Sequence, residues 1–388
     1  MSVFHDSAVE DRFPIMSTAT LQSSRTTSRP ARKVASAGTM VGIDIGCHSV
    51  KIVQLEAGYG TLRPRVCRVV PHAIPLTPAD PARCLDEIGR TLQRAWSSRN
   101  RWWPLPAACT LSMSLMTFRT LELPVAQDEP NSPQEWQNAF LAESAAGPGT
   151  WIVEGWPTQV ELPARGGRSY ALLGIDEEFA SAISHQLWRC GLDCQILDGL
   201  PFAMARAAAA SALGGAVQGG PVAVIDWGES AMTLTVVVEG RPCFTRVLRD
   251  CELKSLTTAV RRTLNLEADQ CRQVMEAYGF GRSAGGVEAS DMSSLLAEIA
   301  VPYLNQLGEE LRRTWLFLQH LSGQTPNRVI LMGGGATLKM SAAHVRAAMP
   351  VPVDVWSMPQ SSAAGAKSES ASAAFGPALA LASLKRDR

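Results

Sequence analysis

The chain has 388 residues, of which 36 are basic and 36 acidic, and hydrophobic residues make up 46% of it. This length allows two domains with proper cores. The balanced charge creates no overall field toward nucleic acid or anionic lipid, so we expect no nucleic-acid partner. No stretch approaches about 18 uninterrupted apolar residues, so we expect no membrane span. Nine cysteines without a Cys-x-x-Cys pair argue against structural zinc and favour a reducing cytoplasm.

The first part of the chain predicts a tail, a set of strands and a helix. Residues 1–38 are rich in Ser, Thr, Ala and Arg without apolar periodicity, which predicts a disordered tail. Three strands are expected between residue 40 and about residue 74. The spacing of apolar residues over 83–96 predicts a helix, and 107–114 predicts a further strand.

The segment 117–190 predicts a mixture of helices and strands. The expected elements are a helix at 133–144, strands at 151–160 and 169–175, and a helix at 177–190.

The rest of the chain predicts further strands and helices. We expect a strand and a helix over 195–213, then a hairpin from 222 and a strand at 241–248. Helices are expected at 252–264 and 267–278, followed by a loop at 281–292. The last long helix is expected at 295–321, interrupted early by Pro302. Residues 360–372 predict a linker. A short apolar helix at 375–384 has a weak polar face, so we expect it to pack on the body of the protein.

Two segments repeat one another, VGIDIGCHSVKIV at 41–53 and VIDWGESAMTLT at 224–235. Each predicts a strand, an Asp-x-Gly turn and a second strand, which is a hairpin with a carboxylate beside exposed backbone N–H groups. A third segment, VILMGGGA at 329–336, is an apolar strand that runs into three glycines. The backbone can pass close to a flat ligand there. Two such hairpins facing each other would clamp a nucleotide.

The residue types in these turns suit phosphate and Mg²⁺. Successive N–H groups in a tight turn bind anions, and carboxylates organise Mg²⁺ mostly through water. Lys51 follows Asp44 by seven residues and would place a cation near the phosphates, and Thr233 stands at the same offset from Asp226. The alternatives are an ordinary turn at each Asp-x-Gly, a solvated strand lysine at Lys51, and a plain glycine turn after a buried strand.

The order of these motifs resembles the actin-like ATPase superfamily, and within it the type IV pilus assembly PilM family, which is related to FtsA. The stretches that carry the resemblance are 42–46 leading to 49–51, 121–124, 191–198, and 304–321 followed by the glycine strand. It covers the chain from about Thr39 onward. It implies an α/β actin-like ATPase fold with duplicated ribonuclease-H-like halves. The implied division is 39–116 and 191–220 for the first half, 117–190 for an inserted 1C-type subdomain, 221–359 for the second half and 360–388 for a linker and C-terminal helix.

The resemblance implies an ATP site with two phosphate loops and an adenosine loop. The implied site residues are Asp44, Gly46, Cys47, His48, Ser49 and Lys51 in the first loop, Asp226, Gly228, Glu229, Ser230 and Thr233 in the second, and Gly333, Gly334 and Gly335 in the adenosine loop. Asp44 and Asp226 would hold Mg²⁺, mostly through water. Asp198 is a candidate for positioning an attacking water, with a helix N-cap as the alternative interpretation.

Four residues depart from the family pattern. Cys47 and His48 replace small hydroxyl residues in the first loop, and Trp227 replaces a small aliphatic residue in the second. Glu229 adds a negative charge close to where phosphates would lie. We therefore expect nucleotide binding to be weak or lost.

The function that the resemblance implies is a cytoplasmic ATP-binding scaffold with at most slow ATPase activity. Such a scaffold would bind the N-terminal cytoplasmic tail of a PilN-like inner-membrane protein, in an extended conformation, and so link to the pilus motor complex. It would be peripheral to the inner membrane through that partner, and self-association is open. The alternatives are an actin-like small-molecule kinase, a cytoplasmic component like the type II secretion L protein, and an FtsA-like membrane tether.

Overall fold

The computed structural model describes residues 40–58, 61–96, 104–124, 132–143, 149–158, 167–211, 220–280, 291–320, 325–358 and 372–384. The tail predicted at 1–38, most of the loop predicted at 281–292 and most of the linker predicted at 360–372 lie outside these residues.

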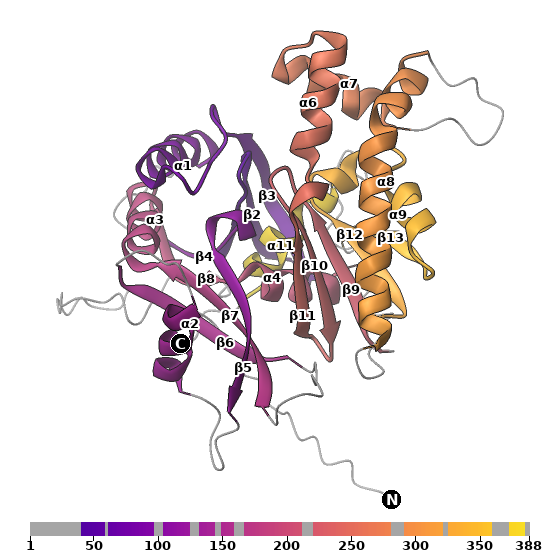
Figure 1. Cartoon of the computed structure of the whole chain (residues 1–388). Coiled ribbons are helices and arrows are strands. Elements are labelled where there is room, and N and C mark those ends of the chain that lie inside the picture. The colour runs from indigo at the N-terminus through magenta and orange to yellow at the C-terminus, as the bar shows by residue number, and fades with distance from the viewer. Residues whose placement is uncertain are drawn as a thin grey trace, which may run out of the picture.

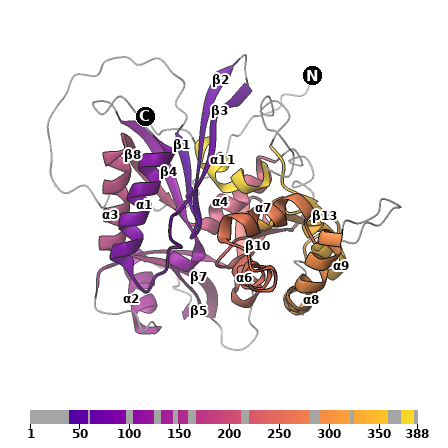
Figure 2. The ribbon, with the colours of Figure 1, turned by 90° about the horizontal axis from the view of Figure 1, so that it is seen from above.

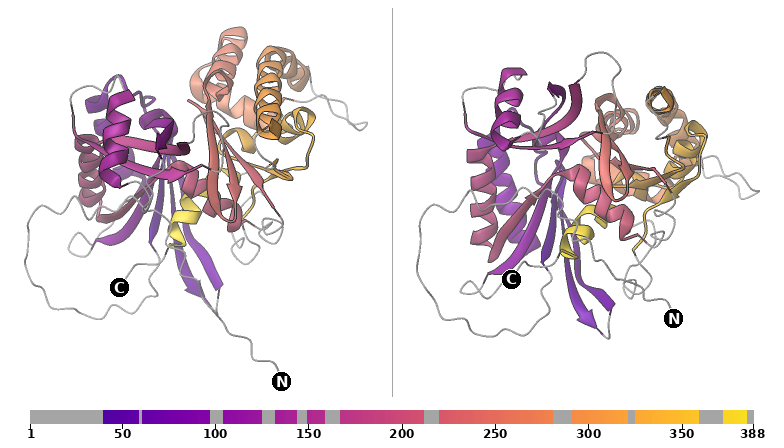
Figure 3. Two further views of the ribbon diagram at one scale, coloured as in Figure 1. Left: turned by 60° about the horizontal axis from the view of Figure 1, so that its bottom comes forward. Right: turned by 90° about the horizontal axis from the view of Figure 1, so that it is seen from below.

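The first half is built on a five-stranded sheet in the order β3-β2-β1-β4-β8. Its strands are β1 (Val41–Ile45), β2 (Ser49–Gly58), β3 (Thr61–Pro71), β4 (Leu105–Leu111) and β8 (Leu192–Asp198). The first three form an antiparallel meander, and β4 and β8 run parallel to β1. All five residues of β1 are buried, as expected for a central strand covered on both faces. In Figure 3, β2 and β3 extend past the rest of this sheet.

Helices α1 (Pro81–Ala95) and α3 (Glu177–Arg189) lie side by side on one face of this sheet (Figure 1). Asp80 starts α1 by accepting a hydrogen bond from the N–H of Arg83, and a proline occupies the first helical position, where its missing N–H costs nothing. Ile88 and Leu92 are fully buried against the sheet. The apolar stripe therefore fixes which face of α1 turns inward.

The second half repeats this topology with the sheet order β11-β10-β9-β12-β13. Its strands are β9 (Val222–Trp227), β10 (Met232–Val238), β11 (Arg241–Leu248), β12 (Arg328–Met332) and β13 (Val353–Val355). Again three antiparallel strands are followed by two parallel ones. The helices of this half are α6 (Leu253–Leu264), α7 (Ala268–Tyr278), α8 (Asp291–His320) and α9 (Ser341–Ala348). The predicted duplication of the halves is thus present at the level of strand order and direction.

A third, three-stranded sheet lies beside the first half, in the order β5-β7-β6. It consists of β5 (Thr117–Pro124), β6 (Trp151–Pro157) and β7 (Gly167–Asp176), and α2 (Pro133–Glu143) packs on it. Phe140 of α2 is fully buried and lies directly over Gly174 of β7, where a Cβ would come within 2.3 Å of its ring. Part of the segment predicted as a subdomain therefore has its own small core, whereas its last helix, α3, packs on the sheet of the first half.

Two helices join the halves, α4 (Leu200–Ala209) and α11 (Gly376–Ala382), as Figures 2 and 3 show. The C-terminal helix is buried, as predicted, although it begins at Gly376 after a 3₁₀ turn at Ala373–Phe375. It crosses β1 so closely that a Cβ on Gly42 would lie 1.9 Å from the carbonyl oxygen of Ala378. Only glycine fits at that crossing.

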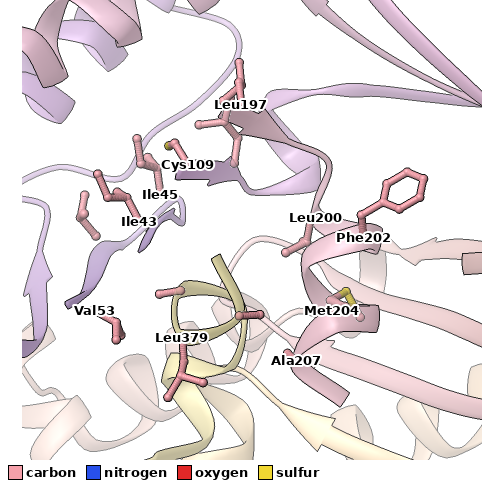
Figure 4. Packing of buried hydrophobic residues seen from close by; sticks show 14 of the residues in the cluster. Ile43, Ile45, Val53, Cys109, Leu197, Leu200, Phe202, Met204, Ala207 and Leu379 are labelled. Atoms are coloured by element: carbon pink, nitrogen blue, oxygen red, sulfur yellow. The ribbon is translucent and has the colours of Figure 1, made fainter. Parts of the chain in front are cut away.

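Apolar side chains from both helices and the first sheet share one core. In Figure 4, Leu379 of α11 lies between Val53 of β2 and the side of α4 that carries Met204 and Ala207. Trp356 is fully buried beside α4, and its Nε1–H donates to the carbonyl of Ala207 over 2.6 Å. The second half is therefore fastened to the connecting helix by a buried hydrogen bond as well as by apolar contact.

Several elements differ from the sequence prediction. The expected break at Pro302 was wrong: α8 runs without interruption from Asp291 to His320. Leu296 and Ala300 before the proline, and Leu307 after it, are buried on one face, and this packing holds the helix together across the proline. Strands β5 and β13 and helix α9 were not predicted. Among the described residues, no helix is long and apolar enough to cross a lipid bilayer.

Candidate functional site

The two Asp-x-Gly segments form hairpin turns of matching geometry. In the first, the N–H of Gly46 donates to the carbonyl of Ser49 over 3.0 Å, and in the second, the N–H of Gly228 donates to the carbonyl of Ala231 over 3.1 Å. Asp44 pairs across its hairpin with Lys51, and Asp226 pairs with Thr233. The duplication therefore extends to individual residue positions.

The carbonyl groups of the first loop are all held from one side, by the segment that follows β3. Gly46 O accepts from the ring Nε2 of His72 at 3.1 Å, Cys47 O from the N–H of Leu76 at 2.8 Å, and His48 O from the N–H of His72 at 2.9 Å. In a trans peptide the N–H points opposite to the C=O, and the described chain has no cis peptide. The N–H groups of Cys47, His48 and Ser49 therefore point away from that segment.

The second loop is held in the same way by the start of α6. Gly228 O accepts from the N–H of Leu253 at 3.2 Å, and Glu229 O accepts from the N–H of Lys254 at 3.0 Å. Both donors are N–H groups in the first turn of α6. N–H groups in the first turn of a helix have no carbonyl partners within that helix. The N–H groups of Glu229 and Ser230 therefore point away from α6. A run of N–H groups in a turn, turned outward like this, is an anion-binding arrangement.

Charged groups from both loops meet around Lys51. Its Nζ lies 2.9 Å from Asp44 Oδ2. Burial alone would lower the pKa of Lys51, but the charges of Asp44 and Asp226 and the hydrogen bond to Asp44 outweigh burial and raise it. Burial raises the pKa of Asp226 to about 6, with Lys51 opposing and Asp44 adding to the rise. Two carboxylates thus face one ammonium group.

The glycine segment after β12 lies directly against the second loop. Gly333 adopts φ +90°, and a Cβ there would come within 2.3 Å of Asp226 Oδ1. Gly335 packs against the ring of Trp227, where a Cβ would approach to 2.4 Å. Gly334 between them is exposed. Of the three glycines, Gly334 is therefore the one whose surface a ligand can reach.

The departure at Trp227 does not crowd the loop. Its side chain is buried in the core of the second half, and its Nε1–H donates to the carbonyl of Cys251 over 3.0 Å. Cys47 is likewise buried, at 4% exposure, and Thr233 is buried at 1%. For Cys47 only the backbone N–H faces outward, and the thiol does not take part in the loop surface.

Two cations that the sequence did not single out lie near the loops, Lys254 of α6 and Arg272 of α7. Burial lowers the pKa of His48 to about 4, and repulsion from His72 when that ring is protonated, and from Lys254 and Arg272, lowers it further. Burial raises the pKa of Glu229, while a hydrogen bond from Thr257, Arg272 and Lys254 oppose the rise. His48 is therefore neutral near pH 7. The side chains of Lys254 and Arg272 partly offset the negative charge of Glu229.

Asp198 lies at the same edge of the first sheet but is engaged elsewhere. It is 1% exposed, and it forms an ion pair with Arg206 of α4. Burial raises its pKa to about 6, with Arg206 opposing the rise. Strand pairing places Asp44, Thr110 and Asp198 side by side, so Asp198 is two strands, about 10 Å, from Asp44. The N-cap interpretation was wrong, because Gly199 is the N-cap of α4.

No protein-family model matches the chain, and no curated protein sequence matches it. Among solved structures, a chain of the "PilM-PilN type IV pilus biogenesis complex" superposes with a TM-score of 0.65 at 21% identity, over 89% of this chain and 97% of that one. The chain has the actin-like ATPase fold. The predicted fold class is thereby confirmed, and so is the resemblance to PilM at the level of fold.

More distant similarity extends to other proteins. The ethanolamine utilization protein EutJ from Carboxydothermus hydrogenoformans gives a TM-score of 0.49 at 12% identity, over 91% of both chains. MreB5 of Spiroplasma citri bound to AMPPNP gives 0.49 at 11% identity, over 88% of this chain and 94% of that one.

Proposed function

We propose that this protein binds a nucleoside triphosphate, as its Mg²⁺ complex, between the two Asp-x-Gly loops. The observation that supports this most is the matched design of the loops: each has its carbonyls held from behind and its N–H groups turned outward. Phosphate oxygens accept hydrogen bonds from such N–H groups. The raised pKa of nearby Lys51 keeps its ammonium group positively charged. Exposed Gly334 is proposed to lie along the nucleoside.

The same residues fit a divalent cation. Asp44 and Asp226 bring two carboxylates near a single ammonium group, and the pKa of Asp226 is raised because the half-buried site removes water from its charge. Carboxylate oxygens are preferred ligands of Mg²⁺, which keeps much of its water. A bound Mg²⁺ would supply the missing positive charge and offset that of the phosphates.

We further propose that the protein is a scaffold of a type IV pilus or related assembly machinery. The support is the similarity in fold to a chain of the PilM-PilN complex. The superposition covers nearly all of that chain. On this proposal, the N-terminal tail of a PilN-like inner-membrane protein binds as an extended segment. The protein would then be cytoplasmic, peripheral to the inner membrane through this partner, and in contact with the pilus motor complex.

Nucleotide is proposed to act as a ligand that favours one arrangement of the halves, with slow hydrolysis at most. The halves are joined by α4 and α11, so a ligand that contacts both Asp-x-Gly loops would bind more tightly when they lie close together. Asp198 is held by Arg206, which supports a low rate of water activation.

A synthetic peptide of the N-terminal cytoplasmic tail of the PilN-like protein from the same organism tests the scaffold. Its binding would be measured by fluorescence anisotropy with and without Mg-ATP, with a scrambled peptide as control. We expect saturable binding of the native peptide that changes in affinity with Mg-ATP for the natural protein but not for Asp226→Asn. Absence of binding would contradict the scaffold, and phosphoryl transfer from ATP to a soluble metabolite would support the kinase alternative.

A further inference from the structure

We infer that His72, which belongs to neither Asp-x-Gly motif, is a positioning residue that holds the first loop ready to bind phosphate. Its ring would fix the peptide between Gly46 and Cys47 with the N–H toward the proposed phosphate site before any ligand arrives. The inference rests on the proposed nucleotide site and adds the residue that sets the shape of one of its loops.

The contact with Gly46 O defines which nitrogen of the His72 ring carries the proton. The side chain of His72 is fully buried, with Nε2 lying 3.1 Å from Gly46 O. A carbonyl oxygen only accepts, so Nε2 carries the proton and donates. Burial lowers the pKa of His72 to about 4, which leaves the ring neutral near pH 7 and Nδ1 as an acceptor.

A polar network in which Thr91 and Glu87 are buried and Arg94 is half exposed contacts the other side of the ring. Thr91 Oγ1 lies 2.9 Å from Nδ1 of His72 and 3.1 Å from Oε1 of Glu87, so its single hydroxyl proton has two acceptors within reach. Arg94 Nη2 donates to Thr91 Oγ1 at 2.8 Å. Glu87, 1% exposed, accepts from Arg94 at 3.3 Å and from the N–H of Ala73 at 2.6 Å. The network therefore holds both the ring and the backbone that follows it, as satisfied polar networks do.

The second half shows why a side chain is required here. Gly228 O, the counterpart of Gly46 O, accepts from the backbone N–H of Leu253 at the start of α6. In the first half the segment after β3 is not helical, and α1 begins only at Pro81. Among the described residues of this segment, 72–80, no helix start faces Gly46, so the imidazole N–H takes the place of a helix N–H.

Loss of this contact would free the Gly46–Cys47 peptide to rotate. A rotated peptide turns its carbonyl toward the proposed phosphate site, which removes one N–H donor and adds a dipole that repels phosphate. Hydrogen bonds to charged acceptors are stronger than those between neutral groups. We therefore expect loss of the contact to weaken Mg-ATP binding on the order of 10- to 100-fold.

Two substitutions at this position separate the hydrogen bond from packing. His72→Phe keeps a ring of similar size without a donor, whereas His72→Gln keeps an N–H₂ donor near the position of Nε2. The affinity of each purified variant for Mg-ATP would be measured by calorimetry alongside its melting temperature. His185→Gln, on the exposed side of α3, is the matched control. We expect His72→Phe to lose 10- to 100-fold, and His72→Gln to stay within about fivefold of the natural protein, whatever their melting temperatures.

A second readout needs no nucleotide. Hydrogen–deuterium exchange would follow the N–H groups of Gly46 and Leu76. The N–H of Gly46 donates to Ser49 O within the first loop, and the N–H of Leu76 donates to Cys47 O of that loop. We expect faster exchange at both in His72→Phe and natural rates in His72→Gln. Equal affinity of His72→Phe and the natural protein, equal weakness of both variants, or unchanged exchange in His72→Phe would each overturn the inference. If the natural protein does not bind Mg-ATP, the proposed site fails and exchange alone decides whether His72 orders the loop.

Discussion

Replacing Asp226 by Asn is expected to stabilise the ligand-free protein while abolishing Mg-nucleotide binding. The carboxylate is charged at neutral pH in a site that raises its pKa to about 6 from an ordinary value of 3.8. Asparagine has the same shape and no charge, and Lys51 keeps its ion pair with Asp44. The substitution therefore removes an unfavourable charge without opening a cavity.

The size of the effect follows from the difference in pKa between the folded and unfolded states. The folded pKa lies above the unfolded one, so the cost is absent well below pH 3.8 and grows as pH rises through 6. A difference of about 2 units corresponds to about 3 kcal/mol at pH 7.5 and about 1 kcal/mol at pH 4.5. Partial exposure of Asp226 reduces these values, so we expect a gain of about 1–3 kcal/mol at pH 7.5.

Urea unfolding of both proteins, without nucleotide or Mg²⁺, measures this gain. Fluorescence of the tryptophans would follow unfolding at pH 7.5 and pH 4.5. We expect a higher midpoint for Asp226→Asn at pH 7.5 and a smaller difference at pH 4.5. A variant that is less stable than the natural protein at pH 7.5 would refute the reasoning, because Asp226 would then stabilise the ligand-free fold.

Three further predictions concern the helix junction and the site. Gly42→Ala forces a Cβ against Ala378 O, so we expect a loss of about 1–3 kcal/mol or more in thermal unfolding, and a loss under about 0.5 kcal/mol would contradict the crossing. Trp356→Phe leaves the buried carbonyl of Ala207 without its donor and should cost about 1–3 kcal/mol in urea unfolding; unchanged stability would argue against that contact. The affinity for Mg-ATP, measured by calorimetry, should fall toward tenfold per pH unit below about pH 6 as Asp226 is protonated, and a flat profile would show that Asp226 does not contact the ion.

Features written in local sequence were predictable. An Asp-x-Gly turn between two β-branched strands specifies a hairpin, and the length of the turn fixes its register. This is why the pairings of Asp44 with Lys51 and of Asp226 with Thr233 follow from equal spacing. The C-terminal helix could be assigned to the interior because a helix with a weak polar face is expected to be buried.

Features that depend on distant contacts were not predictable. His72, Glu87 and Thr91 meet only because α1 folds back over the end of β3, and no spacing in the sequence links them to Gly46. Lys254 and Arg272 reach the loops only through the placement of α6 and α7.

Strong local signals were also overridden by packing. Pro302 would normally end a helix, yet apolar contacts on both sides of it keep α8 whole. Asp198 has the side chain of a helix cap but lies buried against Arg206 instead.

Calorimetric titration of Mg-ATP into the natural protein and into Lys51→Met tests the central claim most directly. Methionine keeps the length of the side chain and removes the charge that pairs with Asp44 and is attracted by Asp226. The account predicts saturable binding of one nucleotide per chain in the natural protein, weakened at least about tenfold in the variant. Absence of saturable binding in the natural protein, or equal affinity in both proteins, would contradict a phosphate site between the two loops.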